Sequence, residues 1–188
     1  MIEHAVEVVV AGAGFAGSLT ALIVDRIGLP VALIDQATHP RFAIGESSTP
    51  IADMLLRDLA QEYGLPRIAP LSSYGSWKRA YPEIACGLKR GFSYFQHEAH
   101  QSFRPTSDHA GEMLVAASAN DNVGDTHWYR PDVDAFFAGE VTAAGIPFLD
   151  ATRLTNIVET NNERWLLKGE RHGEPVRIHA AFLIDATG

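Results

Sequence analysis

The first third of the chain changes from one hydrophobic period to another. Residues 6–11 are short, apolar and β-branched, which is typical of a buried strand, and residues 18–28 then have apolar side chains at helical spacing. Gly28 and Pro30 end that helix, and residues 30–36 form a second apolar run. Two strands joined through a helix of this length predict a parallel, right-handed βαβ unit.

The later pattern extends the same fold class. Residues 51–63 have one apolar side after Pro50 and predict a helix, as do residues 131–145, which precede a short strand at 146–151. The last stretch alternates between strand-like runs and turns at Asn161-Asn162 and at His172-Gly173, which predicts a β-meander. We therefore expect an α/β fold, with a Rossmann-like domain, a β-meander and a small β-rich insertion.

The middle of the chain is where an insertion is expected. Residues 67–126 are rich in Pro, Ser, Gly, His and Asn, with strand-like runs at 91–97 and 112–118. The pattern predicts a discontinuous domain of residues 1–75 and 126–188, with residues 76–125 inserted as part of a substrate domain.

The composition and net charge disfavour several classes of partner and of site. Fifteen Lys and Arg against 23 Asp and Glu give a net charge of −8, which disfavours nucleic acid or an anionic membrane as a partner. The single cysteine, Cys86, cannot form an internal disulfide, and no apolar run approaches the length of a membrane span, so a cytoplasmic protein is expected. His97 and His100 lie in a predicted strand and loop without a matching carboxylate pair, and no metal site is predicted.

One motif predicts a nucleotide site. Gly12, Ala13, Gly14, Phe15, Ala16 and Gly17 spell GxGxxG directly between the first strand and its helix. In that context the first glycine allows the tight turn, the second lets a pyrophosphate approach the backbone and the third lets helix and strand pack closely. Asp35 ends the second strand about 20 residues further on, where a carboxylate accepts from a ribose hydroxyl and repels a 2′-phosphate. The motif favours FAD or NAD over NADP and does not separate the first two.

Several segments together resemble a known group. The segments that carry the resemblance are, in chain order, GxGxxG, GES at Gly45, Glu46 and Ser47, YRPDVD with Arg130, and the terminal DATG. The chain resembles the flavoprotein monooxygenases of the para-hydroxybenzoate hydroxylase fold, and within them the flavin-dependent halogenases and geranylgeranyl-reductase-like proteins. The resemblance implies that Gly12–Gly17 and Asp35 bind FAD. It also implies that Gly45, Glu46, Ser47 and Arg130 border the flavin, although a helix cap for the GES stretch and an ion pair of Arg130 with Asp132 or Asp134 are open alternatives.

The same resemblance implies a catalytic residue. Halogenases share a lysine in a stretch of the form FK-x-G-x-x-[FY], and CGLKRGFSYF aligns Lys89 with it, with Leu88 in place of the usual aromatic residue. There, reduced FAD and O2 lead to hypochlorous acid from chloride, and the lysine directs the chlorinating species to an electron-rich ring. The alternative is an exposed lysine beside Arg90 at the start of a strand.

The family pattern continues beyond this chain. A later GD-containing segment and a W-x-W-x-I-P segment are absent, so we expect the chain to be truncated after residue 188. The resemblance implies an FAD-dependent, halogenase-like oxidoreductase with a small-molecule substrate and a flavin reductase as partner. A flavin hydroxylase, a prenyl-chain reductase and a non-catalytic dinucleotide-binding fragment are the alternatives.

Overall fold

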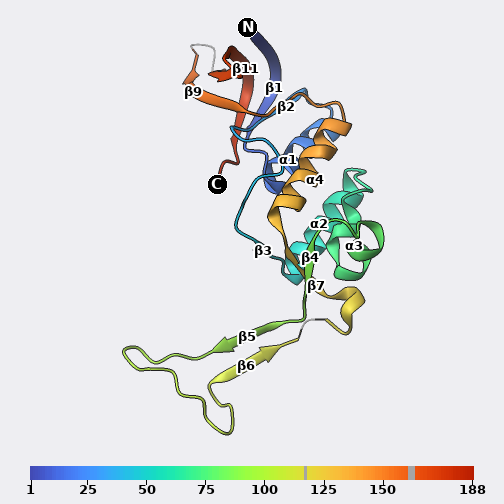
Figure 1. The fold of residues 1–188 in the computed structure, drawn as a ribbon, viewed down its shortest axis with the longest axis vertical. Coiled ribbons are helices and arrows are strands. Elements are labelled where there is room, and N and C mark those ends of the chain that lie inside the picture. Colours follow the sequence, from blue (N-terminus) through green and yellow to red (C-terminus); the bar gives the residue numbers. More distant parts are fainter. Residues whose placement is uncertain (117, 161–163) are drawn as a thin grey trace. The chain divides into compact units, whose positions relative to one another are not determined.

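The computed structural model describes residues 1–116, 118–160 and 164–188, and the chain divides into two compact units (Figure 1). Met1–Ile44 and Tyr129–Gly188 form the first, here called the sheet unit. Gly45–Trp128 form the second, here called the inserted unit.

The sheet unit is built on a six-stranded sheet in the order β8-β2-β1-β11-β10-β9. β1 pairs in parallel with β2 on one side and with β11 on the other, whereas β10 is antiparallel to both β11 and β9. The bounds are β1 Ile2–Ala11, β2 Val31–Ile34, β8 Phe148–Leu149, β9 Thr152–Glu159, β10 Trp165–Arg171 and β11 Glu174–Asp185.

Two helices accompany this sheet. α1 (Phe15–Arg26) joins β1 to the parallel β2, which confirms the predicted βαβ unit, and it contacts both strands. α4 (Arg130–Ala143) packs against α1 and leads to β8 at the sheet edge. The strands bury a continuous apolar core that includes Val9, Ile34, Leu167 and Ile178, so burial of β-branched and Leu side chains stabilises this unit.

The predicted meander is present in β9, β10 and β11. His172 and Gly173 both have positive φ in the two-residue turn between β10 and β11, as the mirror-image turns of tight hairpins require. The other predicted turn, at Asn161-Asn162, lies outside the described residues.

The inserted unit combines helices with short strands. α2 (Pro50–Glu62) begins at Thr49, whose hydroxyl accepts from the Ala52 N–H, and it is followed by the 3₁₀ helix η1 (Ala69–Ser72) and by α3 (Tyr74–Ala80). A three-stranded antiparallel sheet has the order β3-β7-β4, and β5 and β6 form a separate pair. The bounds are β3 Glu46–Ser47, β4 Cys86–Lys89, β5 Phe92–Phe95, β6 Glu112–Val115, η2 Asp121–Val123 and β7 Asp125–Trp128.

The inserted unit starts earlier than the predicted insertion of residues 76–125. It also contains α2 and η1, because α2 packs against η1, and η1 against α3. α3 itself was not predicted, since its formation depends on the fully buried Trp77, whose indole N–H donates to the Ile84 carbonyl 3.1 Å away. The strand-like runs at 91–97 and 112–118 contain β5 and β6, and residue 117 of the second run lies outside the described residues.

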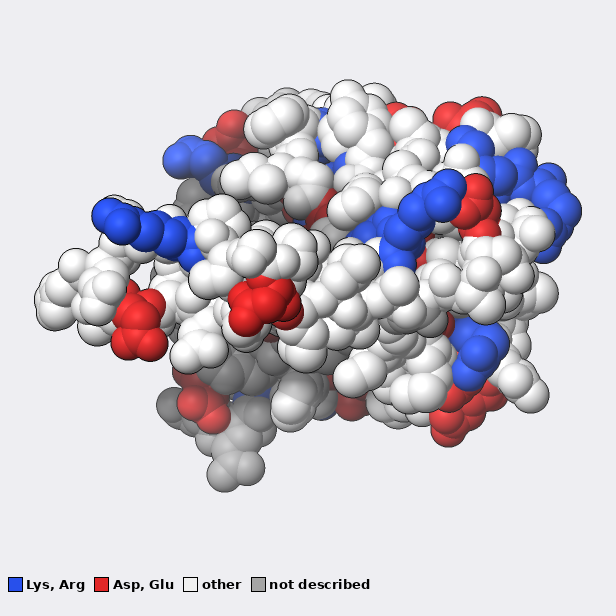
Figure 2. Space-filling model, turned by 90° about the horizontal axis from the view of Figure 1, so that it is seen from below, with Lys and Arg blue, Asp and Glu red and all other residues white. Residues whose placement is uncertain are grey.

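The surface carries charges of both signs. On the face shown in Figure 2, red acidic and blue basic side chains are interspersed among uncharged ones. Within the described residues, no helix is both long enough and apolar enough to cross a membrane.

Candidate functional site

The glycine motif forms a tight turn between β1 and α1. Gly12 has φ of +104°, and a Cβ at this residue would lie 2.3 Å from the Ala186 carbonyl oxygen. A Cβ at Gly17 would lie 1.9 Å from the Gly12 carbonyl oxygen. Both positions therefore require glycine, the first for its backbone conformation and the second for the close packing of α1 on the turn.

Gly14 is different, because the space beside it is bounded by charged side chains. A Cβ there would lie 3.3 Å from Nη2 of Arg130, 3.8 Å from Oδ2 of Asp134 and 3.9 Å from Nη2 of Arg41. Gly14 is also the N-cap of α1 and has no side chain of its own to cap the helix, so the first N–H of α1, at Phe15, donates to Asp134 at 3.1 Å. Two guanidinium groups and the N-terminus of a helix thus converge on one glycine, which suits a group of negative charge.

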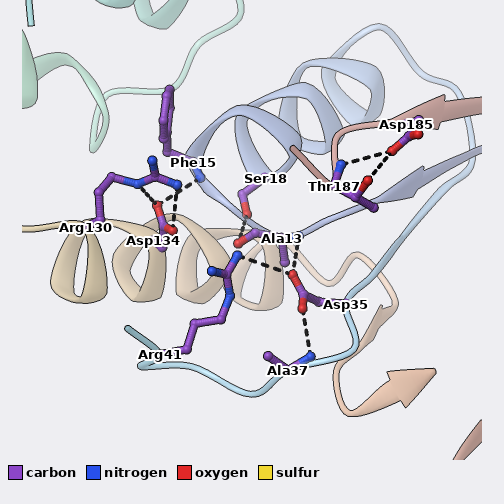
Figure 3. Close-up of polar contacts among 10 residues, drawn as sticks. All are labelled: Ala13, Phe15, Ser18, Asp35, Ala37, Arg41, Arg130, Asp134, Asp185 and Thr187. Carbon is purple, nitrogen blue, oxygen red and sulfur yellow. Dashed lines mark hydrogen bonds and ion pairs between the residues drawn. The ribbon is translucent and has the colours of Figure 1, made fainter. Parts of the chain in front are cut away.

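Asp35 directly follows β2 and lies against the same turn (Figure 3). Its Oδ2 accepts from the Ala13 N–H at 2.7 Å, and its Oδ1 accepts from the Ala37 N–H at 2.8 Å. Arg41 forms an ion pair with the same carboxylate at 3.7 Å. Each carboxylate oxygen can accept a second hydrogen bond, so Asp35 has acceptor capacity left for a ligand hydroxyl.

A cavity of about 410 Å³ opens beside Asp35. It lies where β1 and β2 end, the edge at which open α/β sheets bind ligands. Thr187 of the DATG segment lines it, and Thr187 donates from its N–H and hydroxyl to Asp185, which lowers the pKa of that carboxyl. The lining residues are Ala11, Gly12, Ile34, Asp35, Gln36, Ala37, Arg41, Thr152, Arg153, Leu154 and Thr187.

Arg130 is held by Asp134, one turn further along α4. Its Nε and Nη2 donate to the two carboxylate oxygens at 2.8 and 2.9 Å, and its guanidinium lies 4.7 Å from the centre of the Phe15 ring. Asp134 is fully buried and also accepts from the Phe15 N–H at 3.1 Å. The ion pair left open by the sequence is therefore formed with Asp134, and it fixes the Arg130 guanidinium beside Gly14.

Two buried polar groups near this turn have no hydrogen-bond partner among the described residues. They are Nε of Arg41 and both ring nitrogens of His39. Burial, followed by the nearby charge of Arg41, lowers the pKa of His39. The Nε–H of Arg41 is a donor beside a glycine turn that a bound phosphate group would satisfy, so this arginine fits a dinucleotide.

The other predicted flavin neighbours lie in the inserted unit. Glu46 and Ser47 form β3, pair with Trp128 and His127 of β7, and are exposed, as is Gly45 before them. The helix cap, the open alternative for this stretch as it continues through Ser48 and Thr49, is formed by Thr49 at the start of α2.

Lys89 ends β4 and is buried, with 6% of its surface exposed. The alternative of an exposed lysine at the start of a strand is wrong, because the side chain turns inward between other elements of the inserted unit. Its ammonium donates to the Ser48 carbonyl and lies 3.8 Å from the centre of the Phe92 ring. The neighbouring Arg90 is exposed and pairs with Asp121 at 3.1 Å.

Comparisons with known proteins relate this chain to halogenases. A model of the tryptophan halogenase family matches residues 7–62. The chain is 30% identical over 184 residues to tetracycline 7-halogenase of Kitasatospora aureofaciens, and 30% identical over 150 residues to monodechloroaminopyrrolnitrin halogenase PrnC of Pseudomonas fluorescens. The crystal structure of halogenase PltM in complex with phloroglucinol and FAD has 31% identity and a TM-score of 0.78 over 96% of this chain.

The chain belongs to the flavin-dependent halogenase superfamily. It covers 31% of the tetracycline halogenase, 25% of PrnC and 34% of the PltM chain. It therefore spans between 25% and 34% of these halogenases, and 97% and 79% of it align with the first two.

Some residues of the candidate site and of its surroundings were not predicted from the sequence. Arg41 and His39 lie between Asp35 and the GES stretch, and a cation in that interval is the signal that could have indicated Arg41. Asp53 and Asp125, both buried in the inserted unit, had no such signal because nothing in the sequence shows that they are buried.

Proposed function

We propose that the sheet unit binds FAD and that the chain is the FAD-binding part of a flavin-dependent halogenase. The convergence of the Arg41 and Arg130 guanidinium groups on Gly14, beside a cavity containing Asp35, is the observation that carries the proposal. In this proposal the N–H groups of Gly14, Ala16 and Gly17 and the two arginines hold the pyrophosphate, since the N–H groups of Ala13 and Phe15 donate to Asp35 and Asp134, and Asp35 accepts from a ribose hydroxyl.

The choice of FAD over NAD rests on the family. The Rossmann-type turn serves the ADP half of either dinucleotide, whereas the PltM structure at 31% identity is a complex with FAD. When bound and reduced, FAD supplies the two electrons that activate O2. Overall, reduced FAD, O2, chloride, one proton and a substrate C–H bond give FAD, a C–Cl bond and two molecules of water.

Lys89 is the residue that we assign to the halogenation step. Its ammonium is held by Ser48 and Phe92 in a buried setting, where a hydrogen bond from a cation is stronger than in water. In the proposed mechanism it donates a hydrogen bond to hypochlorous acid and orients the chlorine toward an electron-rich substrate. Gly45, Glu46, Ser47 and Arg130 are proposed to border the flavin, and a flavin reductase is the proposed source of reduced FAD.

Substitution of Arg41 tests the pyrophosphate site. Arg41→Gln should weaken ADP binding about tenfold, the effect of losing about 1.4 kcal/mol of charge-assisted hydrogen bonding, and should leave adenosine binding unchanged. The matched control is Arg177→Gln on an exposed position of β11 in the same unit. Equal losses of ADP and adenosine affinity would place the guanidinium away from the phosphates.

Substitution of Lys89 separates a halogenase from a hydroxylase or a prenyl-chain reductase. Lys89→Met keeps the stem that packs on Phe92 and removes the charge, so the protein supplied with reduced FAD, O2 and chloride should still oxidise the flavin but lose halogenation. Lys78→Met on α3 is the control. Halogenation that survives Lys89→Met would contradict the assigned role.

A further inference from the structure

Three buried ionisable side chains gather in the inserted unit, from three different elements. Asp53 of α2, Lys89 of β4 and Asp125 of β7 are exposed by 7%, 6% and 4%. Lys89 and Asp125 are direct partners in the antiparallel register of β4 and β7, so their side chains leave the sheet on the same face. Asp125 and Lys89 are also the charged groups that act on the Asp53 carboxyl.

Ser48 fixes the position of the Lys89 ammonium. Its carbonyl accepts from Lys89, its N–H donates to the Thr126 carbonyl at 2.9 Å, and its hydroxyl oxygen accepts from the Thr126 N–H at 2.9 Å. Ser48 is therefore tied to β7 through its main chain and its side chain, and the acceptor that Lys89 uses cannot move independently of that strand.

Each of the two carboxyl groups has one oxygen without a hydrogen-bond partner in the part of the chain that the structure describes. These buried oxygens are Oδ1 of Asp53 and Oδ2 of Asp125. Among the described residues, no oxygen of either carboxyl group is recorded in an ion pair with the Lys89 nitrogen, for which the limit is 4.0 Å. Two ionised carboxylates beside one ammonium would leave an uncompensated negative charge in a buried place, which costs several kcal/mol.

We propose that Asp53 and Asp125 are positioning residues for Lys89: they share one proton and together act as the single negative charge that keeps Lys89 an ammonium ion. This inference rests on the proposed function of Lys89. The shared proton lets one carboxyl donate to the other, which supplies the donor that the orphaned oxygens lack.

The electrostatics of Asp53 agree with a shared proton. Burial is the main cause that raises the pKa of Asp53 to about 7, and the neighbouring Asp125 raises it further. The hydrogen bond from Ser48 and the charge of Lys89 act in the opposite direction. A carboxyl with this raised pKa keeps its proton up to about neutral pH, as the shared proton of the proposal requires.

A carboxyl pair that shares one proton decides which form of Lys89 is present. Burial alone would lower the pKa of a lysine and favour the free amine. One negative charge, shared by the two aspartates, favours the ammonium form instead. In this proposal Lys89 is therefore a hydrogen-bond donor and not a nucleophilic amine.

The chain is well suited to a direct test, because it contains only three lysines, Lys78, Lys89 and Lys168. Proteins labelled with ¹³C at lysine Cε and at aspartate Cγ can be titrated by NMR without any flavin. In the unmodified chain one aspartate should titrate near pH 7 and Lys89 should remain charged at pH 8. In Asp125→Asn the Asp53 titration should move to lower pH, because the repulsion and the shared proton are lost, and it should stay above the ordinary value because Asp53 is still buried.

The double variant Asp53→Asn/Asp125→Asn removes the counter-charge altogether. Lys89 should then titrate at least about one pH unit below its value in the unmodified chain. If the double variant does not fold, Lys89→Met gives an independent reading, since loss of the cation should move the aspartate titration upward. Asp58→Asn, an exposed position on the same helix, is the control and should change neither titration.

Two results would overturn the proposal. One is a pair of aspartates that titrate independently near pH 4, and the other is a Lys89 titration unchanged in the double variant. Because these readings need no flavin, they are separate from a failure of FAD binding or of halogenation, which would count against the proposed function instead.

Discussion

Replacement of Gly17 by alanine tests the packing of α1 against the glycine turn. The added methyl would lie 1.9 Å from the Gly12 carbonyl oxygen and 3.1 Å from the Ala186 Cβ. The first contact is with main chain, which cannot rotate away as a side chain can, so we take the upper end of the usual overpacking cost, about 3 kcal/mol. Higher helix propensity of alanine offsets about 1 kcal/mol of this. The expected net loss in the free energy of unfolding is about 2 kcal/mol.

Urea unfolding followed by circular dichroism measures that loss, with the slope of the transition as a check that the unfolded state is unchanged. The matched control is Gly139→Ala in α4, where the added methyl would meet nothing within 4 Å. Helix propensity acts alone there, so this variant should gain about 0.5 to 1 kcal/mol. A Gly17→Ala protein as stable as the unmodified chain would refute the close-packing account.

Two further predictions concern buried carboxyl groups. Because Asp53 has a raised pKa of about 7 against an ordinary value of 3.8, its contribution to stability is fully present below pH 3.8 and is lost as pH rises through 7. Asp53→Asn removes this dependence. In urea unfolding at a series of pH values, the free energy of unfolding of the variant should rise relative to that of the unmodified chain by up to about 1.4 kcal/mol per pH unit between pH 4 and 7. The same pH dependence of the free energy of unfolding in both proteins would argue against a raised pKa. Asp134→Ala leaves the Arg130 guanidinium and the Phe15 N–H without their acceptor, and should cost about 3 kcal/mol in the same assay at pH 7; a loss below about 1 kcal/mol would mean that water replaces the carboxylate.

The sheet unit was predictable because its signals are local. The apolar run before Gly12, the helical spacing after Gly17 and the acid at Asp35 each lie within a few residues of the structure they specify. The same holds for the turn at His172 and Gly173. Such patterns reflect backbone geometry and burial, which act at short range along the chain.

The inserted unit was less predictable because its structure depends on contacts between distant segments. α3 forms around the buried Trp77, and the sheet of β3, β7 and β4 joins residues about 80 positions apart. The burial of Lys89 follows from its pairing with Asp125, a register that no local pattern reveals. Leu88 in place of an aromatic residue gave no indication that the next side chain turns inward.

The most direct test of the central claim is a titration of the purified 188-residue chain with FAD, followed by flavin absorbance and fluorescence, beside a parallel titration with NAD. Gly14→Ala is the informative variant, because Gly14 has an ordinary φ of −67° and its new methyl would meet only the ends of side chains, those of Arg130, Asp134 and Arg41. The account predicts saturable binding of FAD by the unmodified chain, and a folded Gly14→Ala protein that binds FAD at least about tenfold more weakly, since the methyl occupies the space of the pyrophosphate. Saturable binding of NAD without binding of FAD would contradict it.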